Sequence, residues 1–427
     1  MRGLIFVGLA QALLLIAGCG GGSGSGVITS NNNNGSGGGQ AANAATLTVD
    51  SGPTGNDADT PFVTVTVCAP GSTTNCQQID HVEVDTGSYG LRIIASVLSS
   101  PLASALPFEA GPGGNPIVEC TQFVDGYSWG PVEIADVQIA GESAGNVPIQ
   151  VIGDSTFVNE VPANCSSTGK AEDTVAQFGA NGILGVGPFR DDCGSGCATN
   201  PANNWYYTCP PNSTSPTACA GATVSESGQV TNPVVFFQTD NNGVIVQLPS
   251  VPDPGGASTA SGFLVFGIGT EGNNGLGGAT VLTGDRNTGD ITTTYNSQSL
   301  PYSYFDTGSN AYYFNDSTIP TCPSSGSGSS SWLCPASELT LSASNMGQNG
   351  AVSAVSFHIY DANTLFSTYA GNTAFDDLGA SAGDQTAICG SSNCSFDFGL
   401  PFFFGRTVYV AIYGQNTPAG MGPFFAY

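Results

Sequence analysis

The chain has 427 residues, of which 40% are hydrophobic, and this length suits two lobes of about 180 residues better than a single core. It carries 32 acidic residues against 6 basic ones, which makes nucleic acid and anionic membrane surfaces poor partners. The acidity either keeps a secreted protein soluble or indicates tolerance of acid, because few cations are present to form ion pairs that protonation would break.

Residues 1–18 are typical of a signal peptide, because one Arg is followed by a short apolar run and a small-residue ending. The run is too short for a stable transmembrane helix. Together with Cys19 it resembles a bacterial lipoprotein signal, in which Cys19 is lipidated; a plain secretory signal is the alternative. Gly20 is not the Asp that this class associates with inner-membrane retention. We therefore expect a lipid-anchored protein of the bacterial cell envelope, on the outer membrane and facing the periplasm or the surface.

Residues 19–45 are rich in Gly, Ser and Asn and predict a flexible tether. Beyond it we expect an N-terminal β lobe over residues 46–232 and a C-terminal β lobe over residues 233–427. Short runs rich in Val, Ile, Thr, Phe and Tyr lie between clusters of Gly, Pro, Asn and Ser, while long amphipathic helical patterns are almost absent. This pattern indicates a mostly β protein.

Removing Cys19 from the 13 cysteines leaves an even number, which predicts disulfides in an oxidising compartment. Short spacings suggest three local pairs: Cys68–Cys76, Cys322–Cys334 and Cys389–Cys394. A long Gly/Pro/Asn-rich insertion holds four more, whose pairing the sequence leaves open: Cys193, Cys197, Cys209 and Cys219. Their spacing does not suit zinc and neither histidine is near them in sequence, so we predict no metal and no cofactor.

The sequence Asp-Thr-Gly-Ser occurs twice, at residues 85–88 in VEVDTGSYGLRI and at residues 306–309 in YSYFDTGSNAYYF. One copy is weak evidence, because all four residues favour turns. Each copy, however, is entered by a strand-like pattern and followed by a hydrophobic-hydrophobic-Gly segment. These segments end at Gly185 in NGILGVG and at Gly399 in FDFGLPFFFG, where a polar Asp397 stands just before the second one. The same order of signals in both halves predicts an internal duplication.

These turns and segments resemble those of the pepsin-like aspartic proteases, over most of the chain from about residue 46. The resemblance implies an all-β, bilobal fold in which two lobes related by a pseudo-twofold axis surround a central cleft. It places Asp85 and Asp306 opposite each other as the catalytic pair. The segments VIVQLPS and GFLVFGIGT match strands of the family's second lobe ahead of the second Asp, and VYVAIYG matches a late strand.

The resemblance also gives roles to the rest of each turn. The supporting residues are Thr86, Gly87, Ser88, Thr307, Gly308 and Ser309. The glycines are expected to allow close backbone approach. The threonines should brace the two loops against each other, and the serines should hydrogen-bond the outer carboxylate oxygens.

Residues 121–141, TQFVDGYSWGPVEIADVQIAG, fall where the family has its flap hairpin. We expect Phe123, Gly126 and Tyr127 to contact substrate at a mobile tip, with Tyr127 and Trp129 as aromatic cover. The alternative is that both aromatics are ordinary hairpin residues.

An ungapped match puts Phe123 at the family's flap Tyr and Arg92 at the Trp that hydrogen-bonds it. Because both members of this hydrogen bond are replaced, neither polar group is left without its partner. We expect Arg92 to pair with an acidic side chain such as Asp125 or Glu83, as a structural ion pair more than a substrate contact.

Two carboxylates held close together cannot both ionise cheaply, so such a pair retains one proton. The ionised member can then accept a proton from water while the protonated member hydrogen-bonds a peptide carbonyl. The sequence does not assign these two roles between Asp85 and Asp306.

The sequence thus predicts an aspartic-type endopeptidase, a monomer that acts on a peptide or protein substrate. It would meet the membrane only through its N-terminal lipid. Two alternatives stay open: a catalytically silent scaffold that binds peptide in its cleft, and a structural surface lipoprotein whose Cys-rich insertion binds a partner. Both Asp-Thr-Gly-Ser turns are intact, which favours the enzyme.

Overall fold

The computed structural model describes residues 41–123, 126–213, 215, 217–323 and 330–427. The predicted signal peptide, Cys19, Asp125 and most of the predicted tether lie outside these residues. The first strand begins at Ala44, so it overlaps the end of the tether predicted over residues 19–45. No helix among the described residues has the length and apolar character that crossing a membrane requires.

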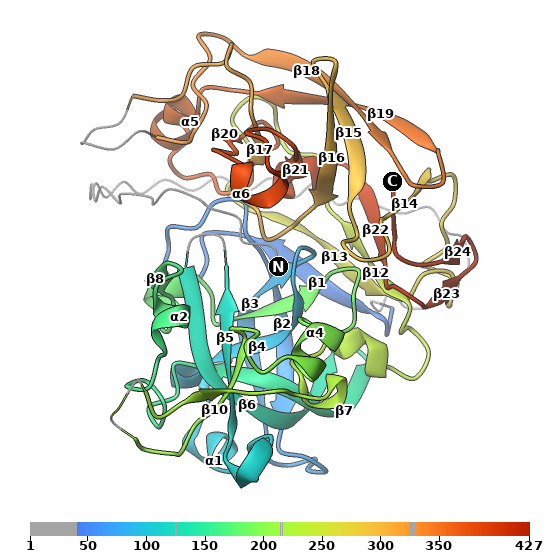
Figure 1. Ribbon diagram of the computed structural model, residues 1–427. Helices are drawn as coiled ribbons and strands as arrows, with labels where there is room; N and C mark the ends of the chain where they lie inside the picture. Colours follow the sequence, from blue (N-terminus) through green and yellow to red (C-terminus); the bar gives the residue numbers. More distant parts are fainter. Residues whose placement is uncertain (1–40, 124–125, 214, 216, 324–329) are drawn as a thin grey trace.

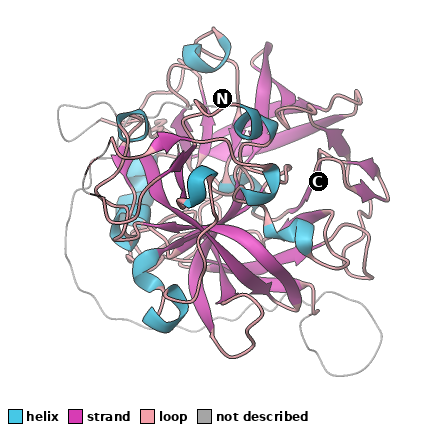
Figure 2. Cartoon of the chain, turned by 60° about the horizontal axis from the view of Figure 1, so that its bottom comes forward, coloured by secondary structure: helices cyan, strands magenta, loops and turns pink. Residues whose placement is uncertain are grey.

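Strands dominate the described chain (Figure 2) and form two large sheets and a small one. The larger sheet holds β1 (Ala44–Val49), β2 (Pro61–Cys68), β3 (Cys76–Asp85), β4 (Tyr89–Ile94), β5 (Ile117–Gln122), β6 (Gly126–Ile139), β7 (Glu142–Ile152), β8 (Lys170–Ala171), β9 (Gly182–Val186), β10 (Tyr206–Thr208), β11 (Ala220–Gly221), β12 (Gly243–Gln247), β13 (Ala260–Phe266), β14 (Val281–Thr283), β22 (Thr407–Ala411) and β25 (Phe424–Ala426). The second sheet holds β15 (Ile291–Tyr295), β16 (Gln298–Phe305), β17 (Tyr312–Phe314), β18 (Leu339–Met346), β19 (Val352–Ile359), β20 (Gly379–Ser381) and β21 (Asp397–Phe398). The small sheet pairs β23 (Asn416–Thr417) with β24 (Gly420–Met421).

The helices are short and lie in the connections between strands. The α-helices are α1 (Ser100–Ala103), α2 (Ala163–Ser166), α3 (Val175–Phe178), α4 (Ser195–Thr199), α5 (Ala362–Thr368) and α6 (Thr386–Cys389). The 3-10 turns are η1 (Ala95–Val97), η2 (Pro112–Gly114), η3 (Glu226–Gly228), η4 (Pro233–Phe236) and η5 (Leu400–Phe403).

The two halves of the chain repeat one pattern of strand pairing. In the first half β3 runs parallel to β9, β9 antiparallel to β4, and β4 parallel to β7. In the second half β16 runs parallel to β21, β21 antiparallel to β17, and β17 parallel to β20. Figure 1 shows these two sets in separate lobes, blue to green below and orange to red above. The predicted duplication and the all-β, two-lobed fold are therefore confirmed.

The lobes share one sheet at their junction. Strand β1 pairs with β13 over six residue positions, and β13 continues through β12 to β22. Strands β12, β13 and β22 follow residue 233 in the chain but extend the sheet of the first lobe. Strands on both sides of the boundary predicted between residues 232 and 233 therefore belong to one sheet.

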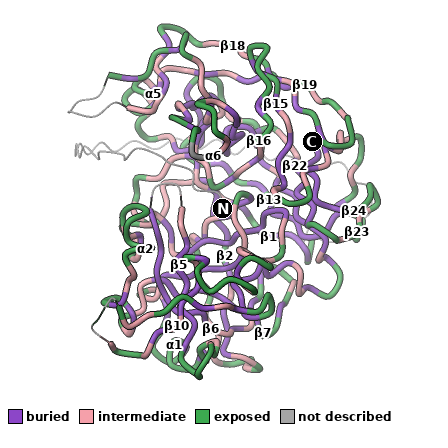
Figure 3. The backbone as a smooth tube through the Cα atoms, viewed as in Figure 1, coloured by how far each residue is buried: buried purple, intermediate pink, exposed green. Residues whose placement is uncertain are grey.

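Buried side chains form a core that continues through both lobes. One cluster extends from Val65 and Val84 in the first half to Phe305 and Phe398 in the second. Figure 3 shows the buried backbone along the strands and the exposed backbone mostly in the connections. Burying a large apolar side chain contributes roughly 1.5–3 kcal/mol, so these strands hold the site loops at their ends firmly in place.

Disulfides join the three local pairs that the spacing predicted. The four cysteines of the insertion pair as Cys193–Cys197 and Cys209–Cys219, and Cys120 joins Cys165 across a separation of 45 residues.

Candidate active site

Each Asp-Thr-Gly-Ser turn follows the end of a buried strand. Asp85 is the last residue of β3, where its Cα pairs with that of Gly185 in β9. Asp306 follows β16, and its backbone N–H donates to the carbonyl of Phe398 at 3.0 Å. The hydrophobic-hydrophobic-Gly segments therefore lie beside both turns, as the resemblance implied.

The two turns face each other closely. A Cβ atom added to Gly87 would lie 2.5 Å from Oδ2 of Asp306, and one added to Gly308 would lie 2.7 Å from Cγ of Asp85. Each glycine thus packs against the carboxyl group of the opposite turn, where no side chain fits. The carboxyl groups of Asp85 and Asp306 lie within hydrogen-bonding reach of each other.

Thr86 and Thr307 join the turns by reciprocal hydrogen bonds. The N–H of Thr86 donates to Oγ1 of Thr307 at 3.1 Å, and the N–H of Thr307 donates to Oγ1 of Thr86 at 3.0 Å. Each hydroxyl in turn donates to a carbonyl across the junction, that of Phe305 at 3.0 Å and that of Val84 at 2.6 Å. Both threonines are buried, so this mutual brace is shielded from water.

Backbone amides orient both carboxyl groups. Oδ1 of Asp85 accepts from the N–H of Gly87 at 2.6 Å and of Ser88 at 3.2 Å. Oδ1 of Asp306 accepts from the N–H of Gly308 at 2.8 Å. Both glycines are exposed while Asp85 is only 6% exposed, so solvent reaches the tips of the turns more than their base.

The two serines do not behave alike. The Ser309 hydroxyl lies 3.1 Å from Oδ2 of Asp306, in agreement with the predicted contact. The Ser88 hydroxyl is buried and has no hydrogen-bond partner among the described residues, so the prediction that it hydrogen-bonds the carboxylate of Asp85 is wrong. Ser88 supports Asp85 through its backbone N–H.

A third carboxyl group, that of Asp397, adjoins the pair. Its Oδ2 accepts from the Ser309 hydroxyl at 2.6 Å, and the side chain is 4% exposed. The chain Asp397–Ser309–Asp306 therefore connects this acid to the pair. In the sequence Asp397 is one polar residue before the second hydrophobic-hydrophobic-Gly segment, and nothing in that position predicts its contact with Ser309.

Burial and neighbouring negative charge act together on these acids. Burial, and then the charges of Asp85 and Asp397, hold the pKa of Asp306 well above its usual range. Burial likewise raises the pKa of Asp397 well above its usual value, opposed by the Ser309 hydrogen bond and assisted by the charge of Asp85. Asp306 and Asp397 therefore retain protons at pH values at which separate carboxyl groups would be fully ionised.

The hairpin of β5 and β6 has its tip between Phe123 and Gly126, ahead of the position predicted for the aromatic cover. Tyr127 is 7% exposed and Trp129 is 1% exposed, and both pack into a small apolar cluster beneath the hairpin. The indole N–H of Trp129 donates to the carbonyl of Phe157 at 3.0 Å. Their burial agrees with the alternative that both are ordinary packing residues of the hairpin and not aromatic cover, because both faces of β6 are covered here.

Phe123 is the aromatic residue at the described edge of the tip. It is partly exposed and its ring contacts that of Phe178 in α3, with the ring centroids 5.7 Å apart. Of the aromatic residues considered in this hairpin, Phe123 is thus the one placed where a bound chain could reach it.

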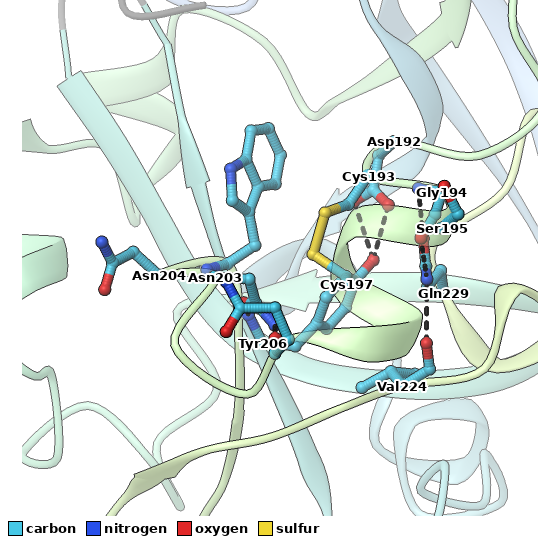
Figure 4. Close-up of a disulfide and its surroundings, with 12 residues drawn as sticks. Asp192, Cys193, Gly194, Ser195, Cys197, Asn203, Asn204, Tyr206, Val224 and Gln229 are labelled. Atoms are coloured by element: carbon cyan, nitrogen blue, oxygen red, sulfur yellow. Dashed lines mark hydrogen bonds between the residues drawn. A yellow bond between two sulfur atoms is a disulfide. The ribbon is translucent and has the colours of Figure 1, made fainter. Parts of the chain in front are cut away.

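Arg92 lies in a buried ionic cluster at the base of the same hairpin. Its guanidinium donates to Glu119 at 2.7 Å and to Asp192 at 3.1 Å, and all three side chains are almost fully buried. The predicted structural ion pair of Arg92 is therefore confirmed, with Glu119 and Asp192 as its partners in place of Glu83, while Asp125 lies outside the described residues. Figure 4 shows Asp192 beside the Cys193–Cys197 disulfide, with the phenol of Tyr206 donating to it at 2.7 Å. Desolvation and the adjoining Glu119 raise the pKa of Asp192 well above its usual value, although the charge of Arg92 and the Tyr206 hydrogen bond oppose the rise.

The chain is similar to solved structures that include an aspartic proteinase from Irpex lacteus, with 15% identity, 90% of this chain and 96% of that chain covered, and a TM-score of 0.49. A search of curated proteins finds no match. The family model described as "Protein of unknown function (DUF3443)" matches residues 39–427. This match spans nearly the whole chain, and the chain therefore belongs to that family.

Proposed function

We propose that this protein is an aspartic-type endopeptidase in which Asp85 and Asp306 activate a water molecule against a peptide carbonyl. One observation carries the proposal: each turn glycine packs against the opposite carboxyl group, which holds the two acids within hydrogen-bonding reach. A merely structural turn has no need of a buried, repelling pair of acids at its tip.

The pair works with one proton between two carboxyl groups. The ionised carboxylate accepts a proton from water as the water oxygen bonds to the carbonyl carbon, and the protonated carboxyl group donates to the carbonyl oxygen. The resulting gem-diol collapses when the amide nitrogen takes the proton of the protonated carboxyl group and the C–N bond breaks, while one gem-diol hydroxyl gives its proton to the ionised carboxylate as the C=O bond of the acid product forms. The pair again holds one proton, so the site is ready for a further turnover.

The chain's own groups keep this geometry in place. The reciprocal threonine bonds fix the separation of the loops, and the N–H groups of Gly87 and Gly308 stabilise the ionised form from one side. Since the donors are already oriented, little reorganisation is needed when charge moves between the acids.

Cleavage of a peptide library from pH 3 to pH 7, with and without a statine-type transition-state mimic, tests the proposal. We expect Asp85→Asn or Asp306→Asn to abolish nearly all cleavage, and the double variant to be little worse than either, since the acids act as a unit. Asp80→Asn is the matched control, because Asp80 lies exposed on the same strand as Asp85. It should cleave like the unaltered protein.

A silent peptide-binding scaffold is the second candidate, and Asp397 is the observation that favours it. The charge of this third acid helps to raise the pKa of Asp306, and it therefore alters the proton balance on which water activation depends. If the unaltered protein cleaves nothing at any of these pH values, yet binds peptides equally well with Asp or Asn at both positions, this second candidate replaces the first.

We also propose that the protein acts at the bacterial cell envelope, attached through a lipid on Cys19. The support is the signal-like segment and the low-complexity tether that follows it. Replacing Cys19 by Ala should move the protein from the membrane to the soluble fraction; continued partition with membranes would contradict the anchor.

A further inference from the structure

A second cluster of acids lies in the C-terminal half, and none of its members belongs to the two Asp-Thr-Gly-Ser turns. Asp253 lies in the connection between β12 and β13, and Asp376 and Asp377 precede β20. One carboxylate oxygen from each of the three lies within 4.8 Å of the others. Ala257 and Ala374 pair by backbone hydrogen bonds of 2.8 and 3.0 Å, which fixes the two connections side by side.

Asp377 is the central observation in this cluster. Its side chain is 0% exposed, and neither carboxylate oxygen has a hydrogen-bond partner among the described residues. Its own backbone amide stabilises the charge without reaching hydrogen-bond geometry. Burying a carboxylate without a hydrogen-bond partner costs free energy. A bound ligand at this position would offset that cost.

The neighbouring acids show the same deficit. Oδ1 of Asp376 and Oδ2 of Asp59 are also buried without a partner in the described chain, although the other oxygen of Asp59 accepts from the N–H of Phe375 at 2.7 Å. Burial, followed by the charges of the other acids, raises the pKa of Asp376 to about 6 and of Asp377 to about 7. Four carboxylate oxygens in one region therefore lack donors.

Two cationic side chains lie nearby, and one of them contacts a member of the cluster. His358 contacts Asp253 and lies 3.0 Å from Glu338; although burial opposes it, these two acids raise the pKa of His358. Arg406 donates to the backbone carbonyl of Phe402 at 2.6 Å and to that of Ser356 at 3.3 Å. The charge of Arg406 lowers the pKa of Asp376, but it is the smallest of the contributions to that pKa.

We propose that Asp253, Asp376 and Asp377 bind a divalent metal ion, and that the ion is calcium. All three contribute oxygen, the donor that calcium takes, and calcium accepts irregular sets of six to eight oxygens. Magnesium demands regular octahedral geometry and gives up its water reluctantly, which suits an asymmetric group of one exposed, one partly buried and one buried acid less well. Zinc prefers nitrogen and sulfur, and the histidine here is already held between two acids.

Protons are the competing occupants of these oxygens. At acid pH they neutralise Asp376 and Asp377, while at neutral pH the metal would take their place. The groups that face the site are Asp59, Glu338, His358, Arg406 and the buried Tyr312. The inference does not rest on the proposed peptidase activity, since a catalytically dead chain would bind the ion equally well.

Thermal unfolding and calorimetric titration of the purified chain with calcium chloride test the proposal. At pH 7, after chelation and dialysis, we expect calcium to raise the Tm by several degrees and to bind with a stoichiometry of about one. Potassium chloride at equal ionic strength should not reproduce the shift, which separates a site from general screening of an acidic chain. At about pH 4 the response should be lost, because protons occupy the oxygens.

Two variants make the outcome specific. Asp377→Asn should abolish the calcium response, with Asp376→Asn as a second variant if the first does not fold. Glu133→Gln is the matched control, since Glu133 is also buried with an unpartnered oxygen but lies in β6 of the first lobe. It should respond to calcium like the unaltered protein. The proposal is overturned if the unaltered chain shows no response at pH 7, or if Asp377→Asn keeps it in full.

Discussion

At the scale of single residues, the role of the turn glycines could be predicted from the sequence, whereas the contact of Asp397 could not. The glycines follow from the motif, because the resemblance requires close approach of two turns. Asp397 stood in the sequence as one polar residue before an apolar segment, and nothing local shows that Ser309 connects it to Asp306. The unpartnered hydroxyl of Ser88 could not be predicted either, since the direction of a side chain depends on packing across the two lobes.

Gly87→Ala tests the close approach directly. The new Cβ would lie 2.5 Å from Oδ2 of Asp306, so the opposite carboxyl group must move. We expect cleavage to fall by about two orders of magnitude, which a displacement near 1 Å can cause, while Tm changes little because Gly87 is exposed. Gly272→Ala is the control, since nothing lies within 4 Å of its Cβ position. Full activity in Gly87→Ala would contradict the arrangement.

Asp397→Asn should move the pH dependence of cleavage. Three connected acids lose their protons in succession, and each remaining negative charge delays the next ionisation. Removing one acid therefore lowers the pKa of Asp306, so the alkaline decline of kcat/KM should shift to lower pH. Rate–pH profiles of both proteins provide the measurement. An unmoved profile would show that Asp397 does not communicate with the pair.

At the scale of elements, local patterns predicted strands and disulfides well and contacts between distant segments poorly. The three local disulfides follow from short spacing. The partners of Arg92, by contrast, come from β5 and from the residue before the Cys193–Cys197 loop, which are brought together only by the folded lobe. In β6 both faces are buried, so the alternation that would distinguish an exposed aromatic from a packed one is missing.

The corrected hairpin gives a paired prediction. Trp129→Ala should destabilise the fold by about 3–5 kcal/mol, because it empties a buried site and leaves the carbonyl of Phe157 without its donor. Phe123→Ala, at the tip, should change KM for peptides while leaving Tm within a few degrees. Denaturant unfolding and steady-state kinetics on both variants separate the two roles. If Phe123→Ala proves the more destabilising of the two, the positions assigned to tip and body are mistaken.

At the scale of the whole molecule, the duplication could be predicted because it repeats a motif and its order, whereas the shared sheet could not. Pairing of β1 with β13 joins residues more than 200 positions apart, and no local pattern specifies such a partner. The dependence of stability on pH is also a property of the whole chain, because carboxyl groups with raised pKa values lie in both lobes. Burial, as the largest cause, raises the pKa of Asp191 to about 6 and of Glu133 to about 8, in addition to Asp376 and Asp377.

These raised values predict that the protein without added metal is most stable in mild acid. A carboxyl group whose folded pKa exceeds its unfolded value favours the fold while it is protonated, and this contribution is lost as pH rises through the folded pKa. The Tm measured in chelator should therefore fall between pH 5 and pH 8, because these groups, with folded pKa values of about 6 to about 8, keep their protons in the fold while they are ionised in the unfolded chain.

Glu133→Gln isolates one of these groups. Because its pKa in the folded chain is about 8, the unaltered residue keeps its proton in the fold while the unfolded chain ionises, so stability falls from the unfolded pKa up to about pH 8. Relative to the unaltered protein, the variant should therefore gain stability at pH 8 more than at pH 5, because Gln keeps the shape of the protonated acid and cannot ionise. Thermal unfolding of both proteins at the two pH values measures the difference. Ionising a buried carboxyl group can only lower the stability of the fold as pH rises. A Tm that stays level or rises from pH 5 to pH 8 would therefore mean that these groups do not govern the stability of this fold.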